Sequence, residues 1–187
     1  MKTKKVRIGV KIAIAVMMSG LLVPFSGFTD VTHAWVPTGA KWSTNQVSKL
    51  SYNKTGSSSV NDIWNEAIFN WNQQSTKPNF STQTTSSPNV EFQGVHISNT
   101  DSDGKAQWYT DSNGTTYHSF AWINTYFTSG YSSLKARSVA SHEIGHVLGL
   151  SHASGCVLMS DNTPTRYDTC GVYTPQSDDL NGINALY

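Results

Sequence analysis

Residues 142–152 read HEIGHVLGLSH and decide the fold around them. They lie at the end of a stretch, Ser132 to Leu150, whose pattern predicts a helix. On a helix, His142 and His146 lie one turn apart on the same face, so both imidazoles can bind one metal ion. Glu143 lies about 100° round the helix from His142. It cannot easily bind the same ion, but it can reach a water molecule beside it.

A catalytic zinc needs a third protein ligand and keeps one position open. Gly149 permits a positive φ angle, which ends the helix and turns the chain so that His152 can return to the metal. The alternative third ligand is a glutamate further along the chain, but no glutamate follows Glu143. We therefore predict one catalytic zinc with Glu143 as the general base. Its predicted ligands are His142, His146 and His152.

Two further helices are expected outside this stretch. Apolar residues spaced three and four apart run from Val60 to Trp71, with Ser59 as the expected N-cap and Pro78 beyond the end. A short closing helix is expected over 177–187. The segment between the active-site helix and this closing helix is expected to be loop.

Strands are expected on either side of the first helix. Residues 50–52 form a candidate first strand, and 88–98 alternate as a strand does. Residues 106–109 and 116–126 are predicted to pair as a hairpin around a tight turn at 111–114. This order of elements predicts an α+β fold in which a helix backs a small sheet.

The first 34 residues are typical of a signal peptide. A basic start is followed by a short apolar run, Ile12 to Val23, and then by Thr32-His33-Ala34, a cleavage site before Trp35. The alternative is a membrane anchor, but a transmembrane helix needs roughly 20 apolar residues. We therefore expect a secreted domain, 35–187, with no stable membrane association.

Charge and cysteine content bound the partners and the compartment. The leader carries five of the 13 basic residues, so 35–187 is net acidic and no nucleic-acid partner is indicated. We expect the domain to be a monomer. Its two cysteines, Cys156 and Cys170, favour a disulfide in an oxidising compartment, and two free thiols are the alternative.

The stretch 142–152 matches H-E-x-x-H-x-x-G-x-x-H, the metzincin signature, in every fixed position. Leu158-Met159-Ser160 resembles the methionine turn that lies beneath the zinc in that clan. Within the clan the sequence is most similar to matrixins, the family related to the matrix metalloproteases, in a bacterial-type secreted form. The resemblance covers 35–187. Its other matching positions are Lys41-Trp42-Ser43, the first helix with Trp71, Ser151 and residues 176–187.

This resemblance implies a fold and an activity. The fold would be a small, twisted, mostly parallel sheet with one antiparallel edge strand, a backing helix, an active-site helix and a C-terminal helix. The activity would be that of a zinc endopeptidase, which hydrolyses peptide bonds by a zinc-bound water activated by Glu143. A protein or peptide substrate would lie extended in a cleft, along an edge strand within 106–124. Residues 160–170 would wall the cleft.

The resemblance also assigns supporting residues. Met159 would lie under the zinc, and Asp178 would support the active-site helix from the C-terminal helix, with Asp179 sharing that role. Asp101 and Asp103 lie in an acidic, glycine-containing turn like those that bind calcium, and matrixins hold calcium in this region. A turn without metal is the alternative.

Two features depart from vertebrate matrixins. No cysteine precedes Cys156, so we expect no latency by a thiolate switch within this chain. Beyond the three ligands, 35–187 contains only His96 and His118. The family's structural zinc site uses three histidines and an aspartate, so it is incomplete here.

Two other classes of function deserve comparison. A catalytically silent zinc-binding adhesin would lack the general base, but Glu143 is present. A carbohydrate-binding module could use the many Trp and Tyr residues, but it would leave the pattern of 142–152 without a purpose.

Overall fold

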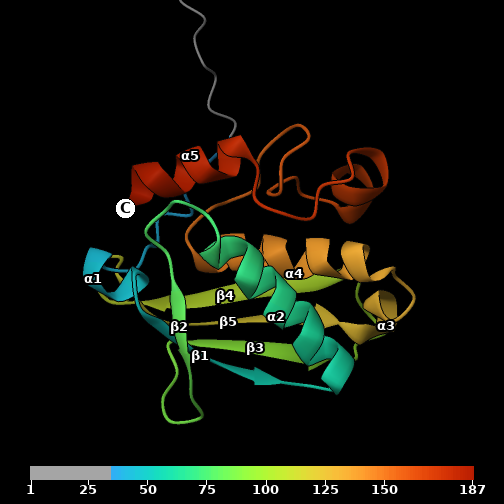
Figure 1. The fold of residues 1–187 in the computed structure, drawn as a ribbon, viewed down its shortest axis with the longest axis horizontal. Helices are drawn as coiled ribbons and strands as arrows, with labels where there is room; N and C mark the ends of the chain where they lie inside the picture. The colour runs from blue at the N-terminus through green and yellow to red at the C-terminus, as the bar shows by residue number, and fades with distance from the viewer. Residues whose placement is uncertain (1–34) are drawn as a thin grey trace, which may run out of the picture. The chain divides into compact units, whose positions relative to one another are not determined.

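A computed structural model describes residues 35–187, and Figure 1 shows their fold. The predicted signal peptide and its cleavage after Ala34 lie outside the described residues. Within 35–187, no helix combines the length and the apolar character that crossing a bilayer requires.

One sheet of five strands runs in the order β2-β1-β3-β5-β4. The neighbours from β2 to β5 pair parallel, and β4 pairs antiparallel with β5 at the edge. The predicted mostly parallel sheet with one antiparallel edge is therefore confirmed, as is the hairpin. The strand bounds are β1 Leu50–Thr55, β2 Phe80–Gln83, β3 Val90–Val95, β4 Gly104–Thr110 and β5 Thr116–Asn124.

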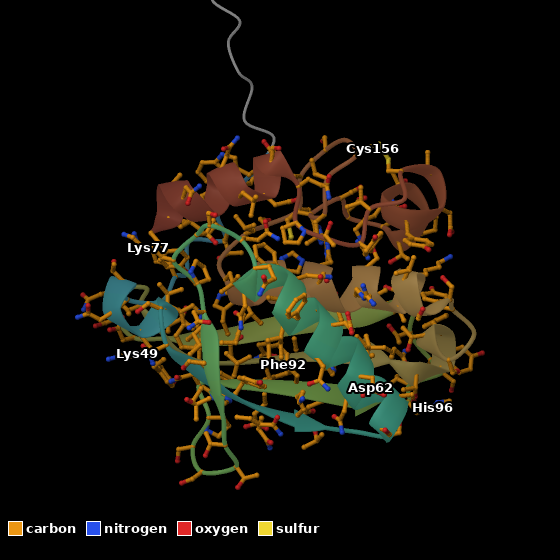
Figure 2. All side chains as sticks on the ribbon, in the orientation of Figure 1. Lys49, Asp62, Lys77, Phe92, His96 and Cys156 are labelled. Atoms are coloured by element: carbon orange, nitrogen blue, oxygen red, sulfur yellow. A yellow bond between two sulfur atoms is a disulfide. The ribbon has the colours of Figure 1, made fainter. Side chains whose placement is uncertain are left out.

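Helix α2, Ser58–Asn72, backs the sheet with the apolar face that the sequence predicts. Trp64 of this helix stacks on Phe92 of β3, with ring centroids 4.7 Å apart. Figure 2 labels Phe92. The predicted N-cap at Ser59 is wrong, because the Ser57 side chain accepts the cap hydrogen bond from Val60 N. Three consecutive serines are each good N-caps, so the sequence pattern could not choose among them.

Helix α4, Ser133–Val147, packs against α2 and the sheet, and most of its residues are buried. Ser132 caps its first turn. Gly149 has a φ of 99°, a left-handed conformation that glycine adopts without strain. The predicted turn after the helix is therefore present.

The remaining helices are short. The predicted closing helix is present as α5, Ser177–Leu186. Strand β2 escaped prediction, and so did three short helical elements: α1 Thr44–Val47, α3 Thr125–Thr128 and the π-helix η1 Pro164–Thr169. The last of these lies in the segment expected to be loop.

Candidate active site

Three histidines come together at the end of α4. His142 and His146 project from the helix, and His152 returns from the loop beyond Gly149. One ring nitrogen from each lies within 4.8 Å of the other two. Spacing along the helix and the turn after it therefore assemble the three predicted ligands.

Backbone carbonyls fix the orientation of two of these rings. Nδ1 of His142 lies 2.8 Å from Leu158 O, and Nδ1 of His146 lies 2.7 Å from Leu150 O. A carbonyl only accepts, so each Nδ1 carries the proton and donates it. Each Nε2 then holds a free lone pair, as a metal-binding imidazole requires.

Burial also keeps these two rings neutral. It lowers the pKa of His142 well below its usual value, with the positive charge of Arg166 acting in the same direction. It lowers the pKa of His146 to about 4. Neutral imidazole is the form that binds a metal ion, so both rings are in the competent state at neutral pH.

Glu143 lies beside the histidines with one oxygen unused. Its side chain is buried, and Oε2 has no hydrogen-bond partner among the described residues. Burial raises its pKa to about 8, although the charge of Arg166 opposes that rise. An unpartnered carboxylate oxygen beside three clustered imidazoles fits a catalytic zinc, which would lower the cost of burying the carboxylate and hold a water within reach.

The methionine turn packs against α4. Met159 is fully buried, and its sulfur approaches the helix where Gly145 has no side chain. Leu158 O orients His142 from the same turn. The turn therefore positions a ligand as well as filling the core.

Asp179 of α5 holds this turn in place. Its carboxylate accepts hydrogen bonds of 3.0 Å from both Leu158 N and Met159 N, and one of 2.8 Å from Gln176 N. Support of the active-site helix by Asp178 stays a prediction, whereas the hydrogen bonds of Asp179 to the methionine turn are present. Asp179 is the third residue of the helix, where its capping-box bond turns the carboxylate inward. Its direct contact is with the methionine turn rather than with the active-site helix.

Similarity to known proteins identifies the family of this chain. Residues 34–187 match the model of the matrixin family. The chain belongs to the matrixin family. No curated protein sequence matches this matrixin. Among solved structures, myroilysin is similar over 63% of this chain and 54% of its own, at 15% identity and a TM-score of 0.45. The chain thus spans about half the length of that protein.

The segment after the methionine turn closes one side of this matrixin's site. A disulfide joins Cys156 to Cys170, with Cα atoms 5.4 Å apart, as the cysteine count predicted. Figure 2 labels Cys156 above α4. The segment 156–170 contains both the methionine turn and η1, so the bridge ties the cleft wall to the turn that supports His142.

A cleft of about 520 Å³ runs between β4 and the segment 161–166, with the histidines and Glu143 at its floor. Gly104, the first residue of β4, packs against Glu143. A Cβ placed on Gly104 would lie 2.5 Å from Glu143 Oε1, so only glycine allows this approach. The sequence placed Gly104 in a calcium-type turn and residues 160–170 in the cleft wall, but it assigned no individual role in the cleft to Gly104, Tyr131 or Arg166.

Both aspartates of the predicted calcium turn line the cleft. Asp103 Oδ2 accepts a hydrogen bond of 3.0 Å from Tyr131 Oη, and Asp101 is exposed. Within 35–187, the three histidines are the only group of at least three side chains placed to share a metal. Calcium at Asp101 and Asp103 stays a prediction.

The two histidines outside the trio have other partners. His96 Nδ1 lies 3.2 Å from Thr125 Oγ1, and His118 Nε2 lies 3.6 Å from Glu91 Oε1. Among residues 35–187, neither His96 nor His118 belongs to a group of at least three side chains that could share a metal.

Replacing Gly145 with alanine is expected to destabilise the protein by about 1–3 kcal/mol, because the added methyl group would overpack the core. The new Cβ would lie 2.3 Å from Met159 Sδ and 3.5 Å from Trp71 Cζ2. The higher helix propensity of alanine would offset about 1 kcal/mol at most. Denaturant unfolding measures the change. Gly130→Ala is the matched control, because its Cβ would meet nothing closer than 3.5 Å. A Gly145→Ala protein as stable as wild type would contradict the close contact.

Proposed function

We propose that this matrixin is a secreted zinc endopeptidase, and that His142, His146 and His152 hold the zinc. The observation that carries the proposal is the three-histidine cluster with the unpartnered Oε2 of Glu143 beside it. Zinc, when bound, supplies a Lewis acid that polarises a peptide carbonyl and makes a water more acidic. Membership of the matrixin family supports the same activity.

Glu143 moves the proton in this mechanism. Its Oε2 accepts a proton from the attacking water and then delivers it to the amine nitrogen of the leaving peptide. Gly104 leaves room for the other oxygen, Oε1, because a side chain at this position would collide with it. The Nδ1 bonds of His142 and His146 hold the ligand rings in one tautomer throughout.

The edge strand supplies the place for an extended substrate. β4 is the last strand in the sheet order, so its outer edge has no strand partner in the sheet. It begins at Gly104, in contact with Glu143. A peptide chain that adds to this edge as a further strand would carry its backbone past the catalytic carboxylate.

The activity is tested with purified 35–187 and an unfolded protein substrate such as casein. Mass spectrometry of the products should show cleavage at internal bonds, and a chelator should abolish it. Products limited to the chain ends would contradict endopeptidase activity. Binding of glycans without any cleavage would favour the carbohydrate-binding alternative.

Secretion is tested by the intact mass of the protein in the culture medium. We expect a chain that begins at Trp35, because Thr32-His33-Ala34 supplies the small residues of a cleavage site. Alkylation without reduction should leave the mass unchanged, because Cys156 and Cys170 are bonded to each other. A full-length chain retained in the cells would contradict the proposed leader.

A further inference from the structure

Arg166 is a buried cation in the wall of the cleft. Its side chain lines the cleft, although only 1% of the residue is exposed. Its guanidinium donates three hydrogen bonds, from Nε, Nη1 and Nη2. The acceptors are Ser138 Oγ at 3.0 Å, Ser160 O at 2.8 Å and Thr163 Oγ1 at 2.6 Å.

These bonds fix the guanidinium relative to the catalytic groups. Ser138 lies on α4 one turn before His142, and Ser160 directly follows Met159. The Ser138 hydroxyl itself donates to Val172 O at 2.6 Å, which leaves its oxygen to accept from Arg166. The guanidinium is therefore held by the same helix and turn that hold the metal ligands.

All three acceptors of Arg166 are neutral. The ion pairs among residues 35–187 join other side chains, and no carboxylate lies within 4.0 Å of this guanidinium. Burial lowers the pKa of Arg166, and the more distant carboxylates of Asp103 and Glu143 only oppose that shift. Burial of a cation without a bonded anion is unfavourable, so this position favours any anion that can reach it.

The guanidinium also has unused donors. Arginine offers five N–H groups in a planar fork, and three are engaged here. Nη1 and Nη2 each keep one N–H group, and a carboxylate, the anion that a peptide substrate carries, can accept hydrogen bonds from such groups. Asp103, the acid at the start of β4, is instead engaged with Tyr131 Oη.

We propose that Arg166 is a specificity-determining residue that binds a carboxylate of the peptide substrate. The carboxylate belongs either to an acidic side chain close to the cleaved bond or to a free C-terminus near it. The inference rests on the proposed endopeptidase function, because the ligand is the substrate itself.

The test compares isosteric peptides. In the first set, pairs of peptides differ only by Glu or Gln at one position, and each of the three positions on either side of the cleaved bond is tested in turn. In the second set, one pair differs only in its C-terminus, which lies close to the cleaved bond and is either a free acid or an amide. In one of these pairs we expect kcat/KM to be about tenfold higher for the peptide with the carboxylate than for its uncharged partner. A tenfold ratio corresponds to a preference of about 1.4 kcal/mol. The pair that shows it identifies side chain or C-terminus as the source.

Variants assign the preference to Arg166. Arg166→Met should bring the ratio close to one. Arg166→Lys keeps the charge but not the fork, and it should retain only a small part of the ratio. Lys105→Met is the matched control, because Lys105 is a second, exposed cation of the same cleft and its loss should leave most of the ratio intact.

Two results would overturn the proposal. One is a ratio near one for every pair with the wild-type protein. The other is loss of the ratio in Lys105→Met but not in the Arg166 variants.

Cleavage of the Gln peptides reports the endopeptidase function separately. If no peptide is cleaved, binding is measured instead. Fluorescence anisotropy of labelled Glu and Gln peptides, titrated with zinc-loaded protein, gives the ratio of their affinities, and this ratio then tests the carboxylate preference. If the Arg166 variants do not fold, the wild-type and Lys105→Met ratios decide it.

Discussion

Replacing Glu143 with alanine is expected to lower kcat/KM for peptide cleavage by about 10³-fold, the middle of the range for loss of a general base. Zinc affinity should stay close to that of wild type, because the carboxylate is not among the three clustered ligands. Removal of a buried carboxylate that has one unpartnered oxygen should not destabilise the fold. The measurements are the rate on a fluorogenic peptide and the zinc content of the same sample.

Glu66→Ala is the matched control. Glu66 lies on α2, where its carboxylate is half exposed and pairs with Arg137 at 3.2 Å. Its loss should change the cleavage rate less than twofold, because exposed pairs contribute little. A Glu143→Ala protein that cleaves at nearly the wild-type rate would refute the proposed proton transfer.

Replacing His152 with glutamine is expected to weaken zinc binding by at least about 100-fold, since even the loss of a residue that only supports a ligand costs 10–100-fold. Cleavage should fall with zinc occupancy. His152 is exposed, whereas His142 is buried. The metal-free protein should therefore unfold at the same denaturant concentration as wild type, which separates loss of the ligand from loss of the fold. Competition with a chromophoric chelator measures the affinity.

His96→Gln provides the comparison. His96 is exposed and contacts Thr125 and Tyr126, away from the trio. Its loss should leave zinc affinity unchanged. If His152→Gln also binds zinc as tightly as wild type, the third ligand is a different residue and the proposed site is wrong.

The local parts of this site were readable from sequence because each depends on short spacings. A helix is enough to place two histidines one turn apart on the same face. A left-handed turn at Gly149 is then enough to bring His152 back to them. The apolar face of α2 is equally local. The family pattern then supplied what no spacing shows, which is the methionine turn around Met159.

Strand β2 could not be read in the same way. Only Phe80 of its four residues is buried, so it carries no alternating pattern. Its first residue is instead held by a side chain from the end of α2. Asn72 at the end of α2 accepts from Phe80 N at 2.9 Å and donates to Phe80 O at 3.0 Å. Such pairing depends on the tertiary fold.

The same limit explains Arg166 and Asp179. An arginine in a polar segment is ordinarily exposed, and only the fold brings Ser138 and Ser160 round Arg166. Two adjacent aspartates are equivalent in sequence. The turn of α5 selects Asp179, because its position in the capping box points it at the methionine turn.

The central claim is that a single zinc on three histidines makes this matrixin a peptidase. The most direct test strips purified 35–187 of metal, adds zinc stepwise and follows cleavage of a fluorogenic peptide. The account predicts no cleavage without metal and a rate that rises in proportion to zinc until one ion is bound per chain. Cleavage that survives complete removal of metal, or a fully loaded protein that cleaves nothing, would contradict it.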